Sequence, residues 1–434
     1  MSLVLVFALG VSAISAQGDI ESVDPTGQTI TYWHQYQPES AQGTTIAAIV
    51  EQFNSTNEWG ITVDASYQGS YGPIGELINA GIVSGELPNL VAGYANAAAS
   101  YMRDNAAVDL APYINSEKWG MGADPDINQA LIDVNTSADG VILAWPNQSS
   151  AQVIAYNQTL LSFLGYDAPP TTVEAFKEVA CAAANATGPN GEDLQGFPIT
   201  TDGSAFESWV AGMGGSIYHD GAFDYQNDAV LATLQMYHDL YADGCAYVPA
   251  ERFAEQTDFN NGIVPFYVTS TAGFTFILSG FQDTGVEADW NIMTFPHNEG
   301  SESLNVFVPS IVMMAGAPEA QLASWLFLKY LATPEVATQW SEGSGYFNPV
   351  PSTAAALDAS TNFSEGLAPY FNAGNALLNN PDIAKYSNPP IAAYDTMRGV
   401  ESTAIADVTS NGMDPADVAA TLQEAADQAV ADSM

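Results

Sequence analysis

Residues 145–157 read Trp-Pro-Asn-Gln-Ser-Ser-Ala-Gln-Val-Ile-Ala-Tyr-Asn and lie about a third of the way along the chain. The polar half, residues 147–150, follows a proline, which cannot donate to a strand ladder, and it is rich in residues that tolerate irregular backbone. The apolar half, residues 153–156, is typical of a short buried strand. We interpret the stretch as a crossover between two lobes, with a cleft beside it that backbone groups and small hydroxyls line.

The length and composition indicate a well-packed globular protein that is large enough to form two or three domains. The chain has 434 residues, of which 47% are hydrophobic and 11% aromatic. Its formal net charge is −43, because only seven Lys and Arg residues stand against 50 acidic ones. Nucleic acid and anionic membrane surfaces both need basic patches on a partner. We therefore expect no nucleic-acid partner.

The start of the chain is typical of a secretory signal. Residues 1–17 contain an apolar run, residues 3–9, followed by small residues. The usual positive charge before such a run is missing, since the first basic residue is Arg103. The alternative is a buried N-terminal strand. From this signal-like segment we expect export to the periplasm or the cell exterior, with the protein associated with the cell surface. No other stretch reaches the ~18 apolar residues of a membrane span.

The two cysteines follow predicted helices. Cys181 ends a helix that begins at a capping box formed by Thr171 and Glu174, and Cys245 follows a strongly amphipathic helix over residues 228–243. Export would permit a disulfide between them. We predict this disulfide; the alternative is two small buried side chains.

Strand-like and helix-like segments alternate at short spacing, which predicts an α/β fold with mostly parallel sheets flanked by helices. The clearest predicted strands are residues 28–34, 61–67, 87–94, 262–268 and 305–314, and the clearest predicted helices are residues 43–53, 73–85, 171–184, 228–243, 319–331 and 415–430. No internal repeat and no long Gly/Ser linker separates two halves. We therefore expect several crossovers, near residues 149–152, 268–271 and 298–310. The predicted N-terminal lobe is residues 28–148 plus about 270–320, and the predicted C-terminal lobe is residues 149–269 plus about 321–434.

Four groups of segments, in order along the chain, carry a family resemblance. They are residues 30–34 with 51–54 and 61–63, residues 85–90, residues 156–176, and residues 327–349 with the motif Ser-Gly-Tyr-Phe-Asn-Pro at 344–349. These segments resemble the extracellular solute-binding proteins of ABC importers, family 1, the group with maltose and glycerol-3-phosphate binding proteins. The resemblance runs from about residue 28 to the C-terminus.

This resemblance implies a two-lobed periplasmic-binding-protein fold of type II, in which the lobes close on a ligand like a hinge. It implies a monomer without cofactor that delivers an unreacted sugar, polyol or related solute to the permease subunits of an ABC transporter. Residues 33–34, 69–71 and 344–346 are most similar to the glycerol-3-phosphate branch. In that branch, residues at the places of Tyr71, Ser149 or Ser150, Ser270, Tyr346 and an arginine near Arg398 surround the ligand. Two departures, at Ala95 and at residues 308–310, count against glycerol phosphate.

A sugar site needs aromatic faces for its C–H surfaces and polar partners for its hydroxyls, since unpaired buried polar groups cost ~1–3 kcal/mol each. Such residues at strand ends, where open α/β sheets bind ligands, are the candidates. They are Trp33, His34, Tyr71, Tyr94, Asn147, Ser149, Ser150, Phe206, Trp209, Ser270, Tyr346 and Arg398.

Arg398 has two interpretations. It is either a bidentate clamp on a phosphate, a carboxylate or sugar hydroxyls, or one half of a structural ion pair. The negative charge of the whole chain disfavours an anionic ligand, so we expect a neutral sugar, with glycerol 3-phosphate or a glycerophosphodiester as the alternative.

Enzymatic activity is not expected. No nucleophile elbow, zinc-binding His-Glu-x-x-His or glycine-rich phosphate loop occurs, and the four histidines lack metal-ligand spacing. We expect no metal site. The alternative from another class is a secreted carbohydrate-active enzyme, which would need two opposed carboxylates.

Overall fold

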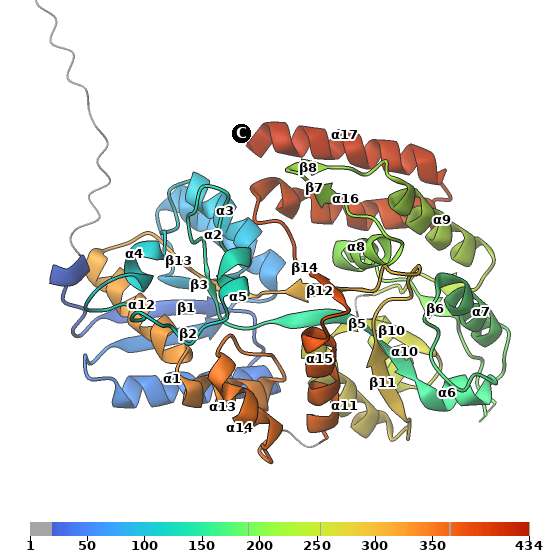
Figure 1. Ribbon diagram of the computed structural model, residues 1–434, viewed down its shortest axis with the longest axis horizontal. Helices are drawn as coiled ribbons and strands as arrows, with labels where there is room; N and C mark the ends of the chain where they lie inside the picture. The colour runs from blue at the N-terminus through green and yellow to red at the C-terminus, as the bar shows by residue number, and fades with distance from the viewer. Residues whose placement is uncertain (1–19, 190, 252, 364–365, 434) are drawn as a thin grey trace, which may run out of the picture.

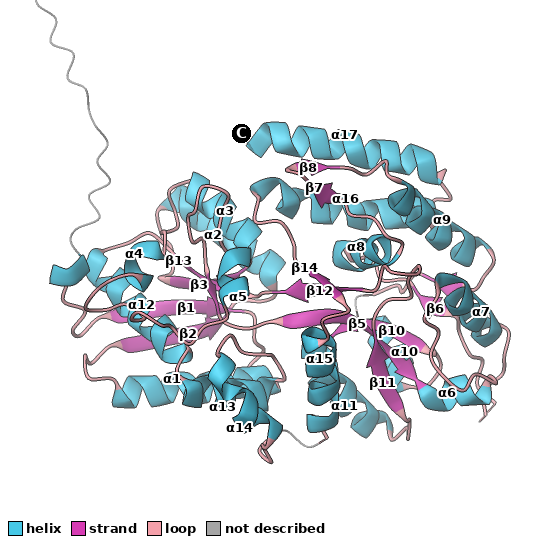
Figure 2. Cartoon of the chain, in the orientation of Figure 1, coloured by secondary structure: helices cyan, strands magenta, loops and turns pink. Residues whose placement is uncertain are grey.

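The computed structural model describes residues 20–189, 191–251, 253–363 and 366–433. The predicted signal segment, residues 1–17, lies outside the described residues. Two α/β lobes lie side by side, and the strands of each are flanked by helices (Figures 1 and 2). The expected fold class is therefore confirmed.

The first lobe is built on a sheet with strand order β2-β1-β3-β13-β4. Its strands are β1 Thr29–His34, β2 Thr62–Tyr67, β3 Leu90–Gly93, β4 Trp145–Pro146 and β13 Ser310–Met313. β1 pairs in parallel with β2 and β3, whereas β13 runs antiparallel to β3 and β4. The helices of this lobe are α1 Ala41–Thr56, α2 Tyr71–Ser84, α3 Ala95–Arg103, α4 Ala111–Ile114, α5 Gln129–Val134, α12 Pro318–Leu331 and α13 Pro334–Ser344.

The alternation predicted for residues 28–34 sets the layers of this lobe. Ile30 and Tyr32 point into a core shared with α1, α12 and α13, and Trp33 on the opposite face packs beside α2 and α3. α1 begins where the Ser40 side chain accepts from the backbone N–H of Gly43, and its apolar stripe from Ile46 to Phe53 is buried. Helices thus cover both faces of the sheet.

The second lobe is organised around β5, Ser150–Asn157. Its partners are β10 Phe266–Ser270, β11 Trp290–Met293 and β12 Ser303–Phe307, and β12 also pairs with β14 Ala384–Tyr386. The short pairs are β6 Phe197–Pro198 with β9 Ala246–Tyr247, and β7 Tyr218–His219 with β8 Ala222–Phe223. The helices are α6 Gln158–Phe163, α7 Val173–Ala184, α8 Gly203–Gly212, α9 Asp228–Ala242, α10 Ala254–Asn260, α11 Phe274–Thr284, α15 Ala368–Asn379, α16 Ala392–Val408 and α17 Pro415–Ser433.

The pairing of this second sheet differs from the expected mostly parallel arrangement. β5 pairs antiparallel with β10, β11 and β12, and the β12–β14 pair is parallel. Both faces of β5 are covered, because Ile154 belongs to the core under α8 and α16 while Val153 and Ala155 belong to the core over α11. A strand buried on both faces is uniformly apolar in either orientation, so its sequence does not report the direction of its partners.

The lobe boundaries also need correction. Residues 270–307 were expected in the first lobe, but β11 and β12 pair with β5 in the second sheet. The chain returns to the first sheet only at β13, so the crossover expected near residues 268–271 is wrong and the one within residues 298–310 lies between β12 and β13. Conversely, α12 and α13 were expected in the second lobe but pack in the core of the first. The third crossing begins at Phe347, just after α13, and continues through the helix α14 Ala354–Asp358; beyond this helix, Leu367 lies in the core of the second lobe.

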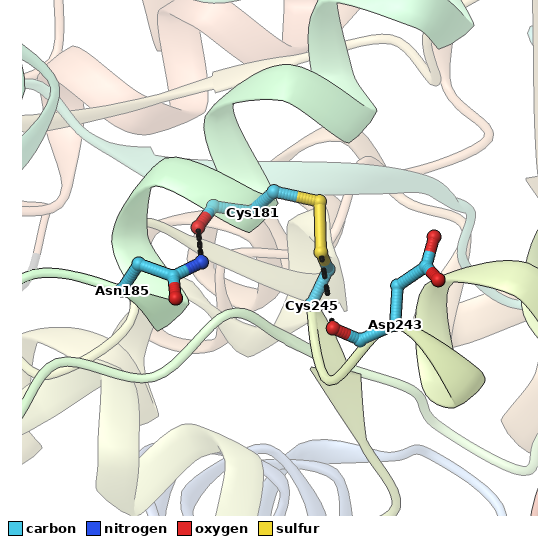
Figure 3. Close-up of a disulfide and its surroundings, with 4 residues drawn as sticks. All are labelled: Cys181, Asn185, Asp243 and Cys245. Carbon is cyan, nitrogen blue, oxygen red and sulfur yellow. Dashed lines mark hydrogen bonds between the residues drawn. A yellow bond between two sulfur atoms is a disulfide. The ribbon is translucent and has the colours of Figure 1, made fainter.

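The predicted disulfide is present in the second lobe. Cys181 on α7 is bonded to Cys245, which lies between α9 and β9 (Figure 3). The Asn185 side chain donates to the Cys181 carbonyl oxygen at 2.8 Å and so caps the end of α7. The N-cap of this helix is Thr172, one residue later than predicted. The bridge holds α7 against the β6–β9 pair.

Candidate functional site

The crossover stretch forms the floor between the lobes. β4 belongs to the first sheet and β5 to the second, and Asn147, Gln148 and Ser149 between them are buried. The backbone of Ser149 exchanges two hydrogen bonds with that of Phe347, which follows α13. The first and third crossings therefore lie side by side, and the prediction that residues 145–157 connect the lobes is confirmed.

A cleft of about 1060 Å³ lies against this floor. Its volume is at the upper end of the range for pockets that bind small molecules. Its lining comes from both lobes and from the crossings between them, and includes Asn128 and Leu131 from the first lobe, Ser149 and Phe347 from the crossings, and Glu207 and Tyr386 from the second lobe. Residues with amide, hydroxyl or carboxyl side chains and residues with aromatic rings thus line one space.

Several predicted residues meet in a tyrosine cluster beside α2 and α3. The rings of Tyr71 and Tyr94 lie 4.9 Å apart, and the Gln35 amide donates to the Tyr71 hydroxyl at 2.8 Å. Tyr346 lies close enough to interact electrostatically with both hydroxyls. Burial raises the pKa of all three hydroxyls, that of Tyr94 to about 12. The cluster is a neutral, hydrogen-bonding aromatic surface.

Arg398 on α16 faces this cluster from the second lobe. Its Nη1 donates to the Ser204 hydroxyl at 2.6 Å, and its Nη2 lies 3.3 Å from the Asp202 carboxylate. Burial alone would lower the pKa of Arg398, but Asp202 and the other acidic neighbours outweigh it and raise the pKa. The guanidinium is therefore already engaged by its own lobe, which supports the structural interpretation of this residue.

Two buried carboxyl groups, one of which belongs to a cleft-lining residue, lie next to the cleft. Glu207 on α8 is 5% exposed and Glu401 on α16 is fully buried. The Tyr394 hydroxyl donates to Glu207, and the Tyr225 hydroxyl donates to Glu401 at 2.6 Å. Burial raises the pKa of Glu207 to about 7 against the hydrogen bond from Tyr394, and burial together with the charge of Glu207 raises that of Glu401 further. The sequence analysis missed both residues.

Two of the aromatic candidates belong to the core. Trp209 and Phe206 are 0% and 1% exposed, and the Trp209 ring packs against Phe176, Phe197 and Phe295. Their prediction as ligand contacts is wrong, because α8 is buried on nearly all its sides and leaves no outward aromatic face.

The neighbouring pair Trp33 and His34 points to opposite faces of β1. Trp33 is half-buried beside α2 and α3. His34 is buried between the rings of Tyr32 and Tyr36, and burial lowers its pKa to about 4, so the imidazole is neutral. Neither of the two lines the cleft described above.

The small polar candidates gather at the floor. Ser150 starts β5, and Ser270 ends β10 opposite Gln152. The Ala151 N–H donates to the Thr271 hydroxyl at 3.1 Å, which ties the end of β10 to the crossover. Asn147, Ser149 and Ser150 are buried beside it. Of these, Ser149 lines the cleft.

Some sequence signals could have identified the buried acids. Glu207 is an isolated acidic residue in a helix of small and apolar residues, and Glu401 stands three residues after Arg398, on the same helix face.

Over the described ranges, no group of three or more His, Cys, Asp or Glu residues is arranged to hold a metal. Within the same ranges, none of the helices combines the length and hydropathy that a bilayer crossing needs.

Solved structures that resemble this chain share its fold at low identity. The cyclic alpha-maltosyl-1,6-maltose binding protein of Arthrobacter globiformis matches with a TM-score of 0.72 and 18% identity, over 92% of this chain and 98% of that one. The GacH receptor of Streptomyces glaucescens, solved without ligand and with acarbose, matches with 0.75 and 18%, over 94% and 100%. UgpB of Mycobacterium tuberculosis in complex with glycerophosphocholine matches with 0.76 and 15%, over 93% and 98%.

Comparison at the sequence level gives the family. A search of curated protein sequences finds no match. The family model for bacterial extracellular solute-binding proteins matches residues 48–366, well over half of the chain. Together with the two lobes and the cleft between them, this match shows that the chain belongs to the bacterial extracellular solute-binding protein family.

Proposed function

We propose that the protein is the substrate-binding component of an ABC importer, that it captures a neutral sugar or polyol in the cleft between its lobes, and that it delivers this ligand unreacted to membrane permease subunits. The cleft carries the proposal. It is bounded by both lobes, large enough for an oligosaccharide, and lined by amides and hydroxyls such as Asn128 and Ser149 next to the rings of Phe347 and Tyr386. These are the groups that sugar hydroxyls and C–H faces need.

Contacts between the lobes support capture by closure. The Asn96 amide on α3 donates to the Asp395 carboxylate on α16 at 3.0 Å, and the two helices lie next to each other (Figure 1). On the floor side, the Tyr36 hydroxyl of the first lobe donates to Gln148 of the crossover at 3.0 Å. A ligand that bridges the lobes would favour this closed arrangement over an open one.

The second candidate ligand is glycerol 3-phosphate or a glycerophosphodiester. It is favoured by the proximity of Tyr71 and Tyr346 to each other and, through Tyr94, to Arg398, because the glycerol-3-phosphate branch has ligand residues at the places of Tyr71, Tyr346 and Arg398. Against it, Arg398 is already paired with Asp202, and the formal net charge of −43 opposes a dianion. A neutral ligand therefore ranks first.

A glycosidase fits the geometry poorly. Such an enzyme needs two carboxyl groups on opposite sides of the scissile bond. Glu207 and Glu401 lie on adjacent helices of the same lobe, and Glu401 is fully buried, so the two cannot flank a substrate. We expect no turnover of a glycoside panel.

Calorimetric titration of the secreted protein tests this proposal. The panel comprises maltotriose, mannotriose, ribitol, glycerol 3-phosphate and glycerophosphocholine. Binding of a sugar or ribitol supports the proposal, and no binding of any of the five contradicts it. Arg398→Ala decides the ligand class: loss of a phosphate compound with retention of a sugar identifies a phosphate clamp, whereas a weakened sugar identifies a fork on hydroxyls. Export, surface association, the monomeric state and the permease partner are part of the same proposal.

A further inference from the structure

The proposed function does not explain why two carboxyl groups, those of Glu207 and Glu401, are buried together. α8 packs against α16, and both carboxyl groups are buried where these two helices meet beside the cleft. They approach closely enough to hydrogen-bond when a proton lies between them. Glu207 also lines the cleft, whereas Glu401 is fully enclosed and a Cβ at Gly203 would collide with its Oε2.

The charges around the pair do not balance. One guanidinium, that of Arg398, serves this space, and it already faces the Asp202 carboxylate at 3.3 Å. The other titratable groups that face the pair are hydroxyls, which supply hydrogen bonds but no positive charge: Tyr225, Tyr386 and Tyr394. Two further carboxylates in a buried space with no cation of their own would be costly, so one of them retains a proton at neutral pH.

The surroundings decide which carboxyl retains it. Glu401 has no exposure to water and is held by Tyr225, so its charged form is the more penalised. Glu207 receives the Tyr394 hydrogen bond, is 5% exposed where Glu401 is fully buried, and lines the cleft. Glu207 is thus the group that ionises at the cleft, and Glu401 is the positioning residue that donates its proton toward it.

We propose that Glu207 is a ligand-contacting carboxylate and that Glu401 shares one proton with it, so that capture of a hydroxyl-bearing ligand is coupled to ionisation of Glu207. The inference rests on the proposed function for the nature of the ligand. A ligand hydroxyl donates to the Glu207 carboxylate, and the proton that Glu207 carried before passes to the buffer. Affinity therefore rises between pH 6 and pH 8, by about tenfold if the ionised fraction rises from about a tenth to nine tenths.

Calorimetry at pH 6 and pH 8, with maltotriose, mannotriose and ribitol as probes, tests the coupling. Wild type is expected to bind about tenfold more tightly at pH 8 and to release protons on binding at pH 6. Glu207→Gln should bind weakly and equally at both pH values, and Glu401→Gln, whose amide donates to an ionised Glu207, should bind equally at both. Glu302→Gln is the matched control, because Glu302 accepts from Thr294 outside the cleft; it should behave as wild type. A wild-type affinity that is equal at the two pH values, or that falls as pH rises, overturns the coupling.

Infrared spectroscopy of the ligand-free protein tests the shared proton without a ligand. A carboxylic-acid band that persists at pH 8 in wild type and disappears in Glu401→Gln supports it. Absence of this band in wild type overturns it. If none of the probes binds, the proposed function fails, and the infrared result alone decides whether the pair holds a proton.

Discussion

Replacing Glu207 by Gln should make the folded protein less sensitive to rising pH. Burial raises the pKa of this carboxyl from 4.5 to about 7. Between these two values the folded chain holds a proton that the unfolded chain has released. The stabilisation from this group is therefore complete below pH 4.5, and it is lost as pH rises through 7. The glutamine of the variant cannot titrate, but its amide oxygen can still accept from Tyr394.

The size of the effect follows from the pKa difference. One pKa unit corresponds to ~1.4 kcal/mol, so ionising Glu207 in the folded state costs on the order of 3 kcal/mol more than in the unfolded chain. Relative to the variant, wild type should lose about this free energy of unfolding between pH 4.5 and pH 8. Glu207 is 5% exposed, so solvent screening reduces the figure little.

Urea unfolding followed by tryptophan fluorescence measures this difference. Trp209 lies on the same helix, fully buried, and reports on the second lobe. The net negative charge of the chain destabilises wild type and variant alike as pH rises. About 1 M salt in all samples screens this repulsion. Glu302→Gln serves as the control and should follow wild type. If Glu207→Gln and wild type lose stability in parallel to within about 0.5 kcal/mol, the assigned burial and titration of Glu207 are wrong.

Three further predictions concern stability and closure. Reducing the Cys181–Cys245 bridge, which closes a loop with a sequence separation of 64, should destabilise the second lobe by up to about 4 kcal/mol, seen as a lower melting temperature with reductant; an unchanged melting temperature would contradict this. Trp209→Ala should cost ~3–5 kcal/mol because it opens a cavity in a sealed core, and a urea midpoint equal to that of wild type would argue against core packing. Asn96→Ala removes the hydrogen bond to Asp395 and should weaken closure by ~1–3 kcal/mol, so that small-angle scattering gives a larger radius of gyration; an identical profile would show that the contact does not hold the lobes together.

The sequence allowed correct prediction of the features that depend on local pattern. The α/β class followed from the alternation of period-2 and period-3.6 segments, and the crossover at residues 147–150 followed from a proline and a polar run before a buried strand. The disulfide could be predicted because both cysteines lie at or just after the end of a predicted helix and the expected export would permit a disulfide. Ser149 at the cleft came from the same crossover argument.

The assignment of elements to lobes could not be predicted in the same way. β10, β11 and β12 are short apolar strands that fit either sheet, and only their pairing with β5 places them in the second. α12 and α13 are likewise amphipathic without a mark of the lobe they cover. Pairing of strands far apart in sequence is a non-local property, because it depends on which surfaces remain open once the nearer segments have folded.

The sequence by itself determined that two lobes of strands and helices are joined through a polar crossover. Backbone propensity and apolar periodicity depend only on residues that are close together in the sequence, so they can be recognised without the tertiary structure. Only the tertiary structure decided which side chains face the ligand space. α8 is buried on nearly every side, so its pattern does not tell that Glu207 lines the cleft while the ring of Trp209 lies in the core. Glu207 and Glu401 are far apart in the chain and become one unit only where α8 packs on α16, and the cost of burying two charges together exists only after that contact has formed.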